Sequence, residues 1–269
     1  MSERLPADLQ AALENCADRR GPFGGRVVFF SETKSTNDIA IAMAERGAPD
    51  GAMAIALAQT AGRGRLGREW FSPAGAGLYV SIVCRVARAA PVLTLAGGVA
   101  TADGIRRATG LPALIKWPND IVIADSVAAG RRRKLAGVLA EGSTGSEGLQ
   151  HVVLGFGINL RPAVYPPAIA ARATSIETEL GREVDRAALL GEILCALNEH
   201  ASTLATGQAR TVLDRWRELS PSAVGSRVEW MANGRTRRGT TAGIDDHGAL
   251  LVRAPDGVER IVAGEMTWL

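Results

Sequence analysis

The densest group of residues able to do chemistry lies between Gly62 and Arg68, where three glycines and three arginines occur within seven residues. We call this segment the arginine–glycine loop. An arginine guanidinium offers a planar set of donors that matches carboxylate or phosphate oxygens two at a time. Glycine permits positive φ angles and close approach to a ligand. The loop is therefore suited to closing over an anion, although these residues alone leave a solvated basic loop equally open.

The glycine spacing of this loop also matches a G-x-G-x-x-G dinucleotide-binding fingerprint that begins at Gly62. Three features argue against that function. Arginines fill the positions between and after the glycines, and the segment after Glu69 contains Pro73 where a helix would be needed. An acidic residue is expected about twenty positions further on, where Cys84 and Arg85 occur instead. We therefore interpret the loop as an anion-binding loop of another kind.

A second group consists of neutral polar residues. Ser35, Thr36 and Asn37 precede a stretch with helical spacing, and Ser35 with Asp38 is typical of a capping box. These residues would then lie at a helix N-terminus, where free backbone N–H groups point outward. Gln59 follows a short apolar strand and offers a further neutral donor and acceptor. Two functions stay open for this group, namely helix capping and recognition of a small polar ligand.

Two more segments carry lysines beside turn residues or glycines. Residues 116–120 read Lys116-Trp117-Pro118-Asn119-Asp120 and interrupt a strand, and Lys134 follows Arg133 at the start of the next strand. Considered alone, the first segment is typical of a turn. Lys134 alone is typical of a solvated charge, and Trp70 alone of a core anchor. Gly155 and Gly157, in a later strand, indicate either a bulge or a close approach of the backbone to a ligand.

The elements that must position these residues follow from the hydrophobic pattern. It predicts strands at 26–30, 52–58, 77–84, 113–116, 121–123, 134–141 and 150–160. Helices are predicted at 5–20, 35–46, 92–109, 185–204 and 208–219, with a polar, basic turn at 126–133 and a loop at 162–174. Because neighbouring strands are joined by turns, we expect an α+β fold with a mixed or antiparallel sheet and helices on one face.

The last segment of the chain has a different pattern. Residues 226–269 show short alternating runs split by turn signals at Asn233-Gly234, Asp246-His247-Gly248 and Asp256-Gly257. This pattern predicts a separate small all-β unit, a partly open barrel.

Composition narrows the class of protein. The chain has 269 residues, 46% of them hydrophobic, which allows one large domain and one small one. The net charge of +3 is too small to predict nucleic-acid binding. The three cysteines lack metal-binding spacing and indicate reduced thiols. No signal-peptide core and no run of eighteen apolar residues occurs, so we expect a cytoplasmic protein outside the membrane.

Four motifs together resemble, in their order and spacing, the bacterial biotin–protein ligases, also called biotin–[acetyl-CoA-carboxylase] ligases. They are residues 35–37, Gln59 with residues 62–70, residues 116–120, and residues 133–137. The resemblance runs from about residue 26 to the C-terminus. It implies a catalytic domain resembling class II aminoacyl-tRNA synthetases over 1–220, with 1–25 as an N-terminal extension, and an SH3-like barrel over 221–269. Because the residues before the first strand are too few for a helix-turn-helix domain, the resemblance implies the monofunctional type.

The resemblance also implies an ATP-dependent ligase that works in two steps. The carboxylate of biotin attacks the α-phosphate of ATP, which gives biotinyl-5′-AMP and pyrophosphate, and a lysine of a biotin carboxyl carrier protein then takes the acyl group. ATP and Mg²⁺ are the implied cofactors, biotin is a substrate, and no DNA or membrane partner is expected. A homodimer is left open.

The resemblance implies catalytic, biotin-binding and nucleotide-binding residues, and one candidate metal ligand. The implied catalytic residues are Lys134, Arg65 and Lys116. The implied biotin-binding residues are Ser35, Thr36, Asn37, Gln59, Gly62, Arg63, Gly64, Arg65, Lys134 and Gly137. The implied nucleotide-binding residues are Arg65, Arg68, Trp70, Lys116, Asn119 and Asn159, and Asp120 is a candidate metal ligand. Neutral groups suit a ureido ring, and cations suit a carboxylate that approaches a triphosphate.

Two alternatives belong beside this prediction. A lipoate– or octanoyl–protein ligase shares the implied catalytic fold, but the Arg-Arg motif leading into three glycines and His-Asp that is typical of that group is absent here. A non-enzymatic nucleic-acid-binding module is suggested by the basic loop and the small barrel. The modest net charge and the lack of an aromatic-studded basic stripe argue against it.

Overall fold

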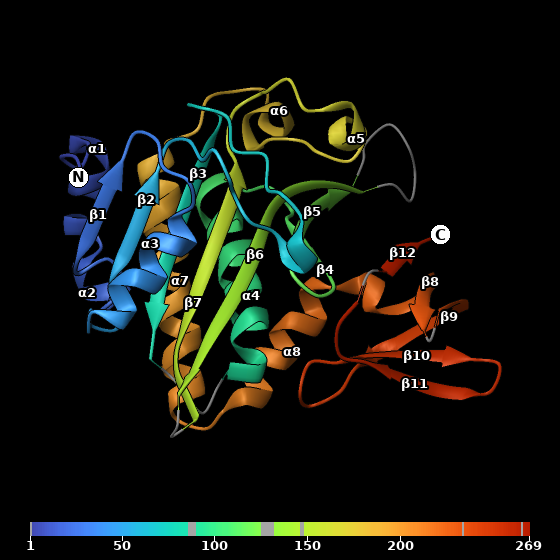
Figure 1. Cartoon of the computed structure of the whole chain (residues 1–269). Helices are drawn as coiled ribbons and strands as arrows, with labels where there is room; N and C mark the ends of the chain where they lie inside the picture. Colours follow the sequence, from blue (N-terminus) through green and yellow to red (C-terminus); the bar gives the residue numbers. More distant parts are fainter. Residues whose placement is uncertain (1, 86–89, 125–131, 146–147, 233, 265) are drawn as a thin grey trace.

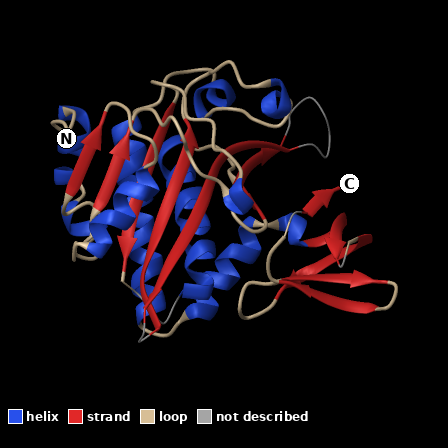
Figure 2. Ribbon diagram, viewed as in Figure 1, coloured by secondary structure: helices blue, strands red, loops and turns tan. Residues whose placement is uncertain are grey.

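The computed structural model describes residues 2–85, 90–124, 132–145, 148–232, 234–264 and 266–269. Within these residues the strands form a seven-stranded sheet and a five-stranded sheet, and the longer helices pack against the larger one (Figure 1, Figure 2). No helix in the described ranges is long and apolar enough to cross a membrane.

The larger sheet is mixed, as the sequence predicts. Its strands are β1 Val27–Phe30, β2 Met53–Ala56, β3 Gly77–Cys84, β4 Leu114–Lys116, β5 Asp120–Ala124, β6 Arg132–Gly145 and β7 Gly148–Asn159. Their order is β1-β2-β3-β7-β6-β5-β4, with β1 and β2 parallel and the other neighbours antiparallel. The order places β7 between β3 and β6, so motifs far apart in sequence lie on adjacent strands.

Helices cover the two faces of this sheet unequally. They are α1 Ala7–Asn15, α2 Ala17–Arg20, α3 Thr36–Glu45, α4 Ala90–Thr109, α5 Pro167–Ala170, α6 Ile176–Leu180, α7 Arg186–Ala205 and α8 Ala209–Leu219, with single 3₁₀ turns at Arg65–Gly67 (η1) and Pro221–Ala223 (η3). The main core lies between the sheet and α4, α7 and α8. In Figure 1 these three helices lie behind the sheet, and α3 lies in front of it.

The prediction of helices on one face is therefore wrong for α3. Ala40 and Ala44 of this helix pack with Ala54, Val83 and Val153 of β2, β3 and β7 in a second, smaller core. These small side chains let the helix approach the strands closely. Because α3 packs over β2, β3 and β7, β6, β5 and β4 on the same face are left for other segments.

The smaller sheet is antiparallel throughout. It contains β8 Val224–Ala232, β9 Arg235–Ile244, β10 Leu250–Ala254, β11 Gly257–Ile261 and β12 Met266–Trp268, in the order β11-β10-β9-β8-β12. Buried Val228, Leu250 and Val252 belong to the same core as the larger sheet. The indole N–H of Trp117 donates to the carbonyl of Gly248 at 3.0 Å. This sheet is thus fixed against the β4–β5 turn.

The connection after β7 differs from the prediction. The expected loop at 162–174 contains the short helix α5, which starts at a proline as N-terminal helical turns commonly do. Helix α6 follows, with Ser175 as its N-cap and Gly181 in the left-handed conformation at its end. Most of the turn predicted at 126–133 and one residue of the Asn233-Gly234 turn lie outside the described residues.

Candidate active site

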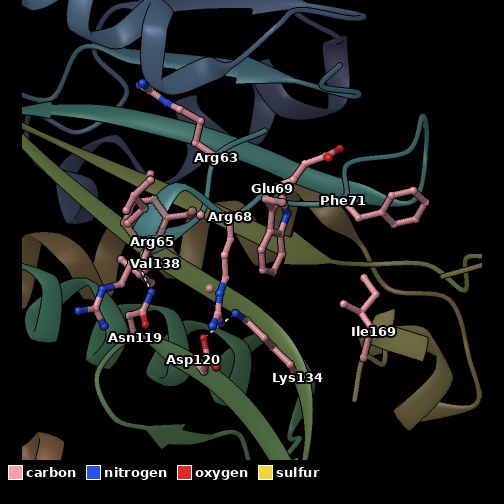
Figure 3. A pocket seen from close by; sticks show the side chains of 18 of the residues that line it. Arg63, Arg65, Arg68, Glu69, Phe71, Asn119, Asp120, Lys134, Val138 and Ile169 are labelled. Atoms are coloured by element: carbon pink, nitrogen blue, oxygen red, sulfur yellow. Dashed lines mark hydrogen bonds and ion pairs between the residues drawn. The ribbon is translucent and has the colours of Figure 1, made fainter. Parts of the chain in front are cut away.

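A pocket of about 320 Å³ lies on the sheet face that α3 covers only in part (Figure 3). Its size is within the range of small-molecule sites. Its walls come from the N-terminus of α3, the arginine–glycine loop, strands β4 to β7, the segment around α5, and β12. The pocket therefore collects residues from most of the chain.

One end of the pocket is a network of neutral hydrogen bonds. The side-chain oxygen of Gln59 accepts from the backbone N–H of Thr36 at 2.8 Å and from its hydroxyl at 3.1 Å. The amide nitrogen of Gln59 donates to Ser72 at 3.0 Å. The buried hydroxyl of Ser81, on β3, lies against both Thr36 and Asn37. We call this end, formed by residues 35–37 with Gln59, the neutral end.

The predicted capping box at this helix is wrong. Ser35 is the N-cap residue, but its side chain makes no capping hydrogen bond. Gln59 instead receives the free N–H of Thr36, because the segment after β2 brings its side chain to the helix N-terminus. Asp38 forms an ion pair with Arg63, with 2.8 Å between its carboxylate oxygen and the guanidinium nitrogen. Ser35 is 2% exposed and lines the pocket.

Two residues predicted to bind biotin also contact protein groups. The guanidinium of Arg63 pairs with Asp38 and, at 3.0 Å, with Glu141 of β6. The amide nitrogen of Asn37 also donates to Glu141. Figure 3 shows Arg63 pointing away from the other arginines. Both residues line the pocket, and the charge of Arg63 and one amide hydrogen of Asn37 already have protein partners.

The arginine–glycine loop uses its glycines in two ways. The backbone N–H of Trp70 donates to the carbonyl of Gly62 at 2.8 Å, and a Cβ on Gly62 would lie 2.5 Å from the carbonyl oxygen of Trp70. Gly64 is extended at φ −117°, whereas Gly67 has φ 72°. Leu66 also has a positive φ of 58° and is exposed. Positive φ is thus needed at the tip, and close approach of two chain segments explains Gly62.

Glycines of β6 and β7 form the floor of the pocket. A Cβ on Gly157 would overlap the indole of Trp70, and one on Gly155 would overlap the side chain of Asn37. Gly137 lies opposite Gly157 in the ladder and faces Trp70 as well. The β6–β7 register is continuous through these positions. The bulge is therefore excluded at these positions, the two glycines make room for the side chains of Trp70 and Asn37, and an approach of this backbone to a ligand stays a prediction.

The other end of the pocket is cationic. The ammonium of Lys134 lies 2.5 Å from a carboxylate oxygen of Asp120 and 4.9 Å from the ring centre of Trp70. In Figure 3, Arg68 extends from the loop toward Asp120 and Lys134. Lys116 starts the β4–β5 turn, and its ammonium lies 5.8 Å from the ring centre of Trp268. We call this part the cationic end.

Burial changes the acidity of the pocket cations. Burial lowers the pKa of Arg65, opposed by the charge of Asp120. Burial also lowers the pKa of Lys116, again opposed by Asp120, and the neighbouring charges of Lys134, Arg172 and Arg132 lower it further. Positive groups are therefore held together where water is partly excluded. Such an arrangement strengthens attraction for an incoming anion.

The comparisons with known proteins agree with this geometry. Residues 29–159 match the Biotin/lipoate A/B protein ligase family, and residues 224–267 match the Biotin protein ligase C terminal domain. The biotin–[acetyl-CoA-carboxylase] ligase of Paracoccus denitrificans is 34% identical over 245 residues, which cover 88% of this chain and 98% of the relative. The chain belongs to the biotin/lipoate A/B protein ligase family.

Other similar proteins of this family extend the comparison. The bifunctional ligase/repressor BirA of Bacillus subtilis is 31% identical over 248 residues, which cover 90% of this chain and 74% of BirA. The structure of the biotin protein ligase of Aquifex aeolicus in complex with biotin and ATP aligns with a TM-score of 0.75 at 25% identity. That alignment covers 91% of this chain and 99% of the Aquifex chain.

The structure brings the predicted site residues together with one exception. Gly62 lies at the base of the loop and does not line the pocket, whereas the others do, namely Ser35, Thr36, Asn37, Gln59, Arg63, Gly64, Arg65, Arg68, Trp70, Lys116, Asn119, Asp120, Lys134, Gly137 and Asn159. Lining a pocket does not assign a role, so the roles predicted for these residues stay predictions.

Two asparagines predicted to bind the nucleotide contact the backbone. The side-chain nitrogen of Asn159 donates to the carbonyl oxygens of Thr174 at 3.0 Å and Lys134 at 3.3 Å. The side-chain nitrogen of Asn119 donates to the carbonyl of Val138. These bonds fix β6 beside its neighbours. Both amide hydrogens of Asn159 have a backbone partner, whereas Asn119 uses one of its two.

Sequence reasoning missed several lining residues. Arg132 lies two positions before Lys134 on the same strand, so strand alternation could have placed both on one face. Arg172, Tyr165 and Met266 line the pocket from segments that lie beside it only in three dimensions. No local pattern in the sequence indicates these three.

A complete protein metal site is absent from the described ranges, which contain no cluster of three or more histidine, cysteine, aspartate or glutamate side chains able to hold a metal. Asp120 lies at the cationic end and is paired with Lys134. One or two carboxylates suffice for Mg²⁺ that arrives with nucleotide phosphates. Asp120 therefore fits one protein contact to such an ion.

Proposed function

We propose that this protein is an ATP-dependent biotin–protein ligase, which activates biotin as biotinyl-5′-AMP and transfers it to a lysine of a carrier protein. One observation carries the proposal. A single pocket joins a neutral hydrogen-bonding end to a cationic end, in a chain whose relatives include proteins named as biotin–[acetyl-CoA-carboxylase] ligases. The joint presence of the two ends matches a substrate with a neutral ring and a carboxylate.

Biotin recognition is assigned to the neutral end. Its ureido ring needs oriented donors and acceptors, and the rest of its body needs apolar walls. Ser35, Thr36 and Gln59 supply the polar groups, while Trp70 and Phe156 supply apolar surface. Because Gln59 and Thr36 are already held by Ser72 and Ser81, their orientation is set before a ligand arrives.

The first chemical step is assigned to the cationic end. A carboxylate oxygen of biotin attacks the α-phosphorus of ATP, the bond from that phosphorus to the bridging oxygen breaks, and its electron pair leaves with pyrophosphate. Repulsion between the carboxylate and the triphosphate is the main obstacle. Arg65, Lys116 and Lys134 are positive groups of the pocket that oppose this repulsion.

The nucleotide is assigned to the same end. Arg68 points into it from the loop. Trp70 lines the pocket, and its buried indole nitrogen has no hydrogen-bond partner among the described residues. A bound Mg²⁺ ion would neutralise phosphate charge, and Asp120 is the residue we assign to it. Lys134 would then shift from Asp120 toward the substrate carboxylate.

In the second step the lysine ε-amine of the carrier attacks the activated carbonyl, and AMP leaves with the electron pair of the broken bond. The partner is a biotin carboxyl carrier protein of a biotin-dependent carboxylase. A cytoplasmic location, the absence of a DNA partner, the domain limits 1–220 and 221–269, and the monomeric or dimeric state stay predictions.

The test is carrier labelling with three candidate acids. The purified protein is incubated with ATP, Mg²⁺, a carrier domain and either biotin, lipoate or octanoate. Mass spectrometry should find one biotin on one carrier lysine, with pyrophosphate release that depends on biotin. Labelling by lipoate or octanoate instead would move the protein to the other branch of its family, and absence of labelling with all three would reject the ligase function.

A further inference from the structure

Two arginines outside the predicted motifs extend the cationic end. Arg132 is the first residue of β6, and Arg172 follows α5. Both line the pocket. The segment that carries Arg172 is clipped to β6, because the carbonyl of Arg172 accepts the backbone N–H of Lys134 at 2.6 Å. The two guanidinium groups therefore approach the pocket from two segments fixed side by side.

Within the described ranges, no carboxylate offsets the charges of these two arginines. In the part of the chain that the structure describes, neither has a carboxylate within ion-pair distance, and the printed bond of Arg172 is to the carbonyl of Ala168 at 3.2 Å. The charges of both arginines and of Lys134 act on Lys116, which lines the same pocket. Asp120, the carboxylate that acts on Lys116, already contacts Lys134 at 2.5 Å.

Three cations at one place are costly for the protein without a bound anion. Lys116 and Arg132 are partly buried and lose hydration, and the like charges repel one another. Arg132 is partly buried in the pocket wall, and this burial lowers its pKa. An anion with several charges would relieve both costs, whereas a singly charged carboxylate would leave most of them.

We propose that Arg132 and Arg172, with Lys116, form a subsite that holds the β- and γ-phosphates of the nucleotide and the pyrophosphate that leaves. The inference rests on the proposed function and adds to it two arginines that lie outside the arginine–glycine loop. When the bond between the α-phosphorus and the bridging oxygen breaks, the electron pair and the added negative charge go to pyrophosphate. The two guanidinium groups contact the oxygens where this charge appears.

The experiment compares ligands that contain or lack these phosphates. ATP, inorganic pyrophosphate, AMP and biotin are titrated calorimetrically, at one Mg²⁺ concentration, into wild type, Arg132→Gln and Arg172→Gln. Loss of one charge-assisted contact is expected to weaken ATP and pyrophosphate binding about tenfold for Arg132→Gln. A smaller loss is expected for Arg172→Gln, because Arg172 is exposed. AMP and biotin affinities should stay unchanged.

Two further variants separate charge from structure. Arg182→Gln removes an equal charge at an exposed position outside the pocket and should bind all four ligands as wild type does. Arg132→Lys keeps the charge and should recover most of the lost affinity. Unchanged ATP and pyrophosphate binding in both glutamine variants would overturn the subsite, and so would an equal loss of AMP binding or no recovery in Arg132→Lys.

The two proposals fail in different ways. A wild-type protein that forms no biotinyl-5′-AMP would overturn the proposed function. Normal adenylate formation in the wild type, together with unchanged pyrophosphate binding in both glutamine variants, would overturn only the subsite.

Discussion

The two ends of the pocket are built on opposite principles. At the neutral end, Thr36, Gln59 and Ser81 satisfy one another through short hydrogen bonds. At the cationic end, Lys116 lies among like charges that lower its pKa further after burial has lowered it. The polar groups of the neutral end are stabilised by one another. The cations of the cationic end are stabilised only in part by the protein and gain the rest of their stabilisation when an anion binds.

This difference suggests how the work of catalysis is divided. A satisfied network fixes the geometry of a substrate that does not change during the reaction, as a ureido ring does not. Unneutralised cations gain most when negative charge accumulates, which happens as the carboxylate meets the α-phosphate. Variants at the neutral end should therefore affect binding and stability, and variants at the cationic end should affect rate.

Lys134→Gln, at the cationic end, should have the largest effect of the four variants on the adenylation rate. Glutamine keeps length and polarity but removes the ammonium between Asp120 and Trp70. Loss of one preorganised donor typically costs about 10²–10³ in rate, so single-turnover adenylation should fall by this factor while biotin affinity changes little. Lys134→Arg should recover little, since a planar fork does not fit a compact ammonium site. An equal fall in affinity and rate would make Lys134 a binding residue only.

Arg65→Ala should have the next largest effect. The guanidinium of Arg65 is partly buried at the tip of the arginine–glycine loop, and a charge-assisted contact is worth about 1.5–3 kcal/mol. Adenylate formation and retention should weaken roughly ten- to a hundredfold, with unchanged thermal stability. The matched control is Arg46→Ala, an exposed arginine that does not line the pocket. Wild-type adenylate affinity in Arg65→Ala would identify the loop as solvated.

Gln59→Ala, at the neutral end, should lower stability and biotin affinity and leave the adenylation rate almost unchanged. The variant removes the group that caps α3 at Thr36, and loss of a cap costs about 1 kcal/mol of unfolding free energy. Denaturant unfolding should show this loss, and biotin affinity should fall about tenfold. The adenylation rate at saturating biotin should stay close to wild type. A large fall in that rate with normal biotin affinity would contradict the division between the two ends.

Lys116→Met should have the smallest effect of the four variants, and the direction of its effect on the unfolding free energy is informative. The lowered pKa of Lys116 means that its charged form is less stable in the folded protein than in the unfolded chain. At pH 7 lysine is charged, so removal of the charge should raise the unfolding free energy by about 0.5–1 kcal/mol while activity falls. No variant at the neutral end should raise the unfolding free energy in this way. Lower stability of Lys116→Met would show that the cationic end is already compensated.

The elements with strong local patterns could be predicted from the sequence. Strand β3 was predicted at its observed limits, and α7 within one residue at each end, because apolar periodicity and the Asp185 cap are local signals. The family motifs predicted which residues share a pocket. The set of pocket residues could therefore be predicted better than the arrangement of the elements in space.

Contacts between distant segments could not be predicted. Asn37 meets Glu141 because the sheet order places β7 between β3 and β6, and chain order does not specify this. Gln59 takes the capping role expected of Ser35 because the segment after β2 pairs with Thr33, just before α3. Arg172 and Met266 reach the pocket from segments whose own patterns carry no sign of it. Long-range packing decided each of these.

The most direct test of the account is a rapid-quench measurement of one turnover without carrier. Wild-type protein is mixed with labelled biotin, ATP and Mg²⁺, and bound biotinyl-5′-AMP and free pyrophosphate are measured in the same samples. The account predicts equal amounts of both, about one per chain, and no pyrophosphate when biotin is omitted. Pyrophosphate release without biotin, or biotin binding without any adenylate, would contradict it.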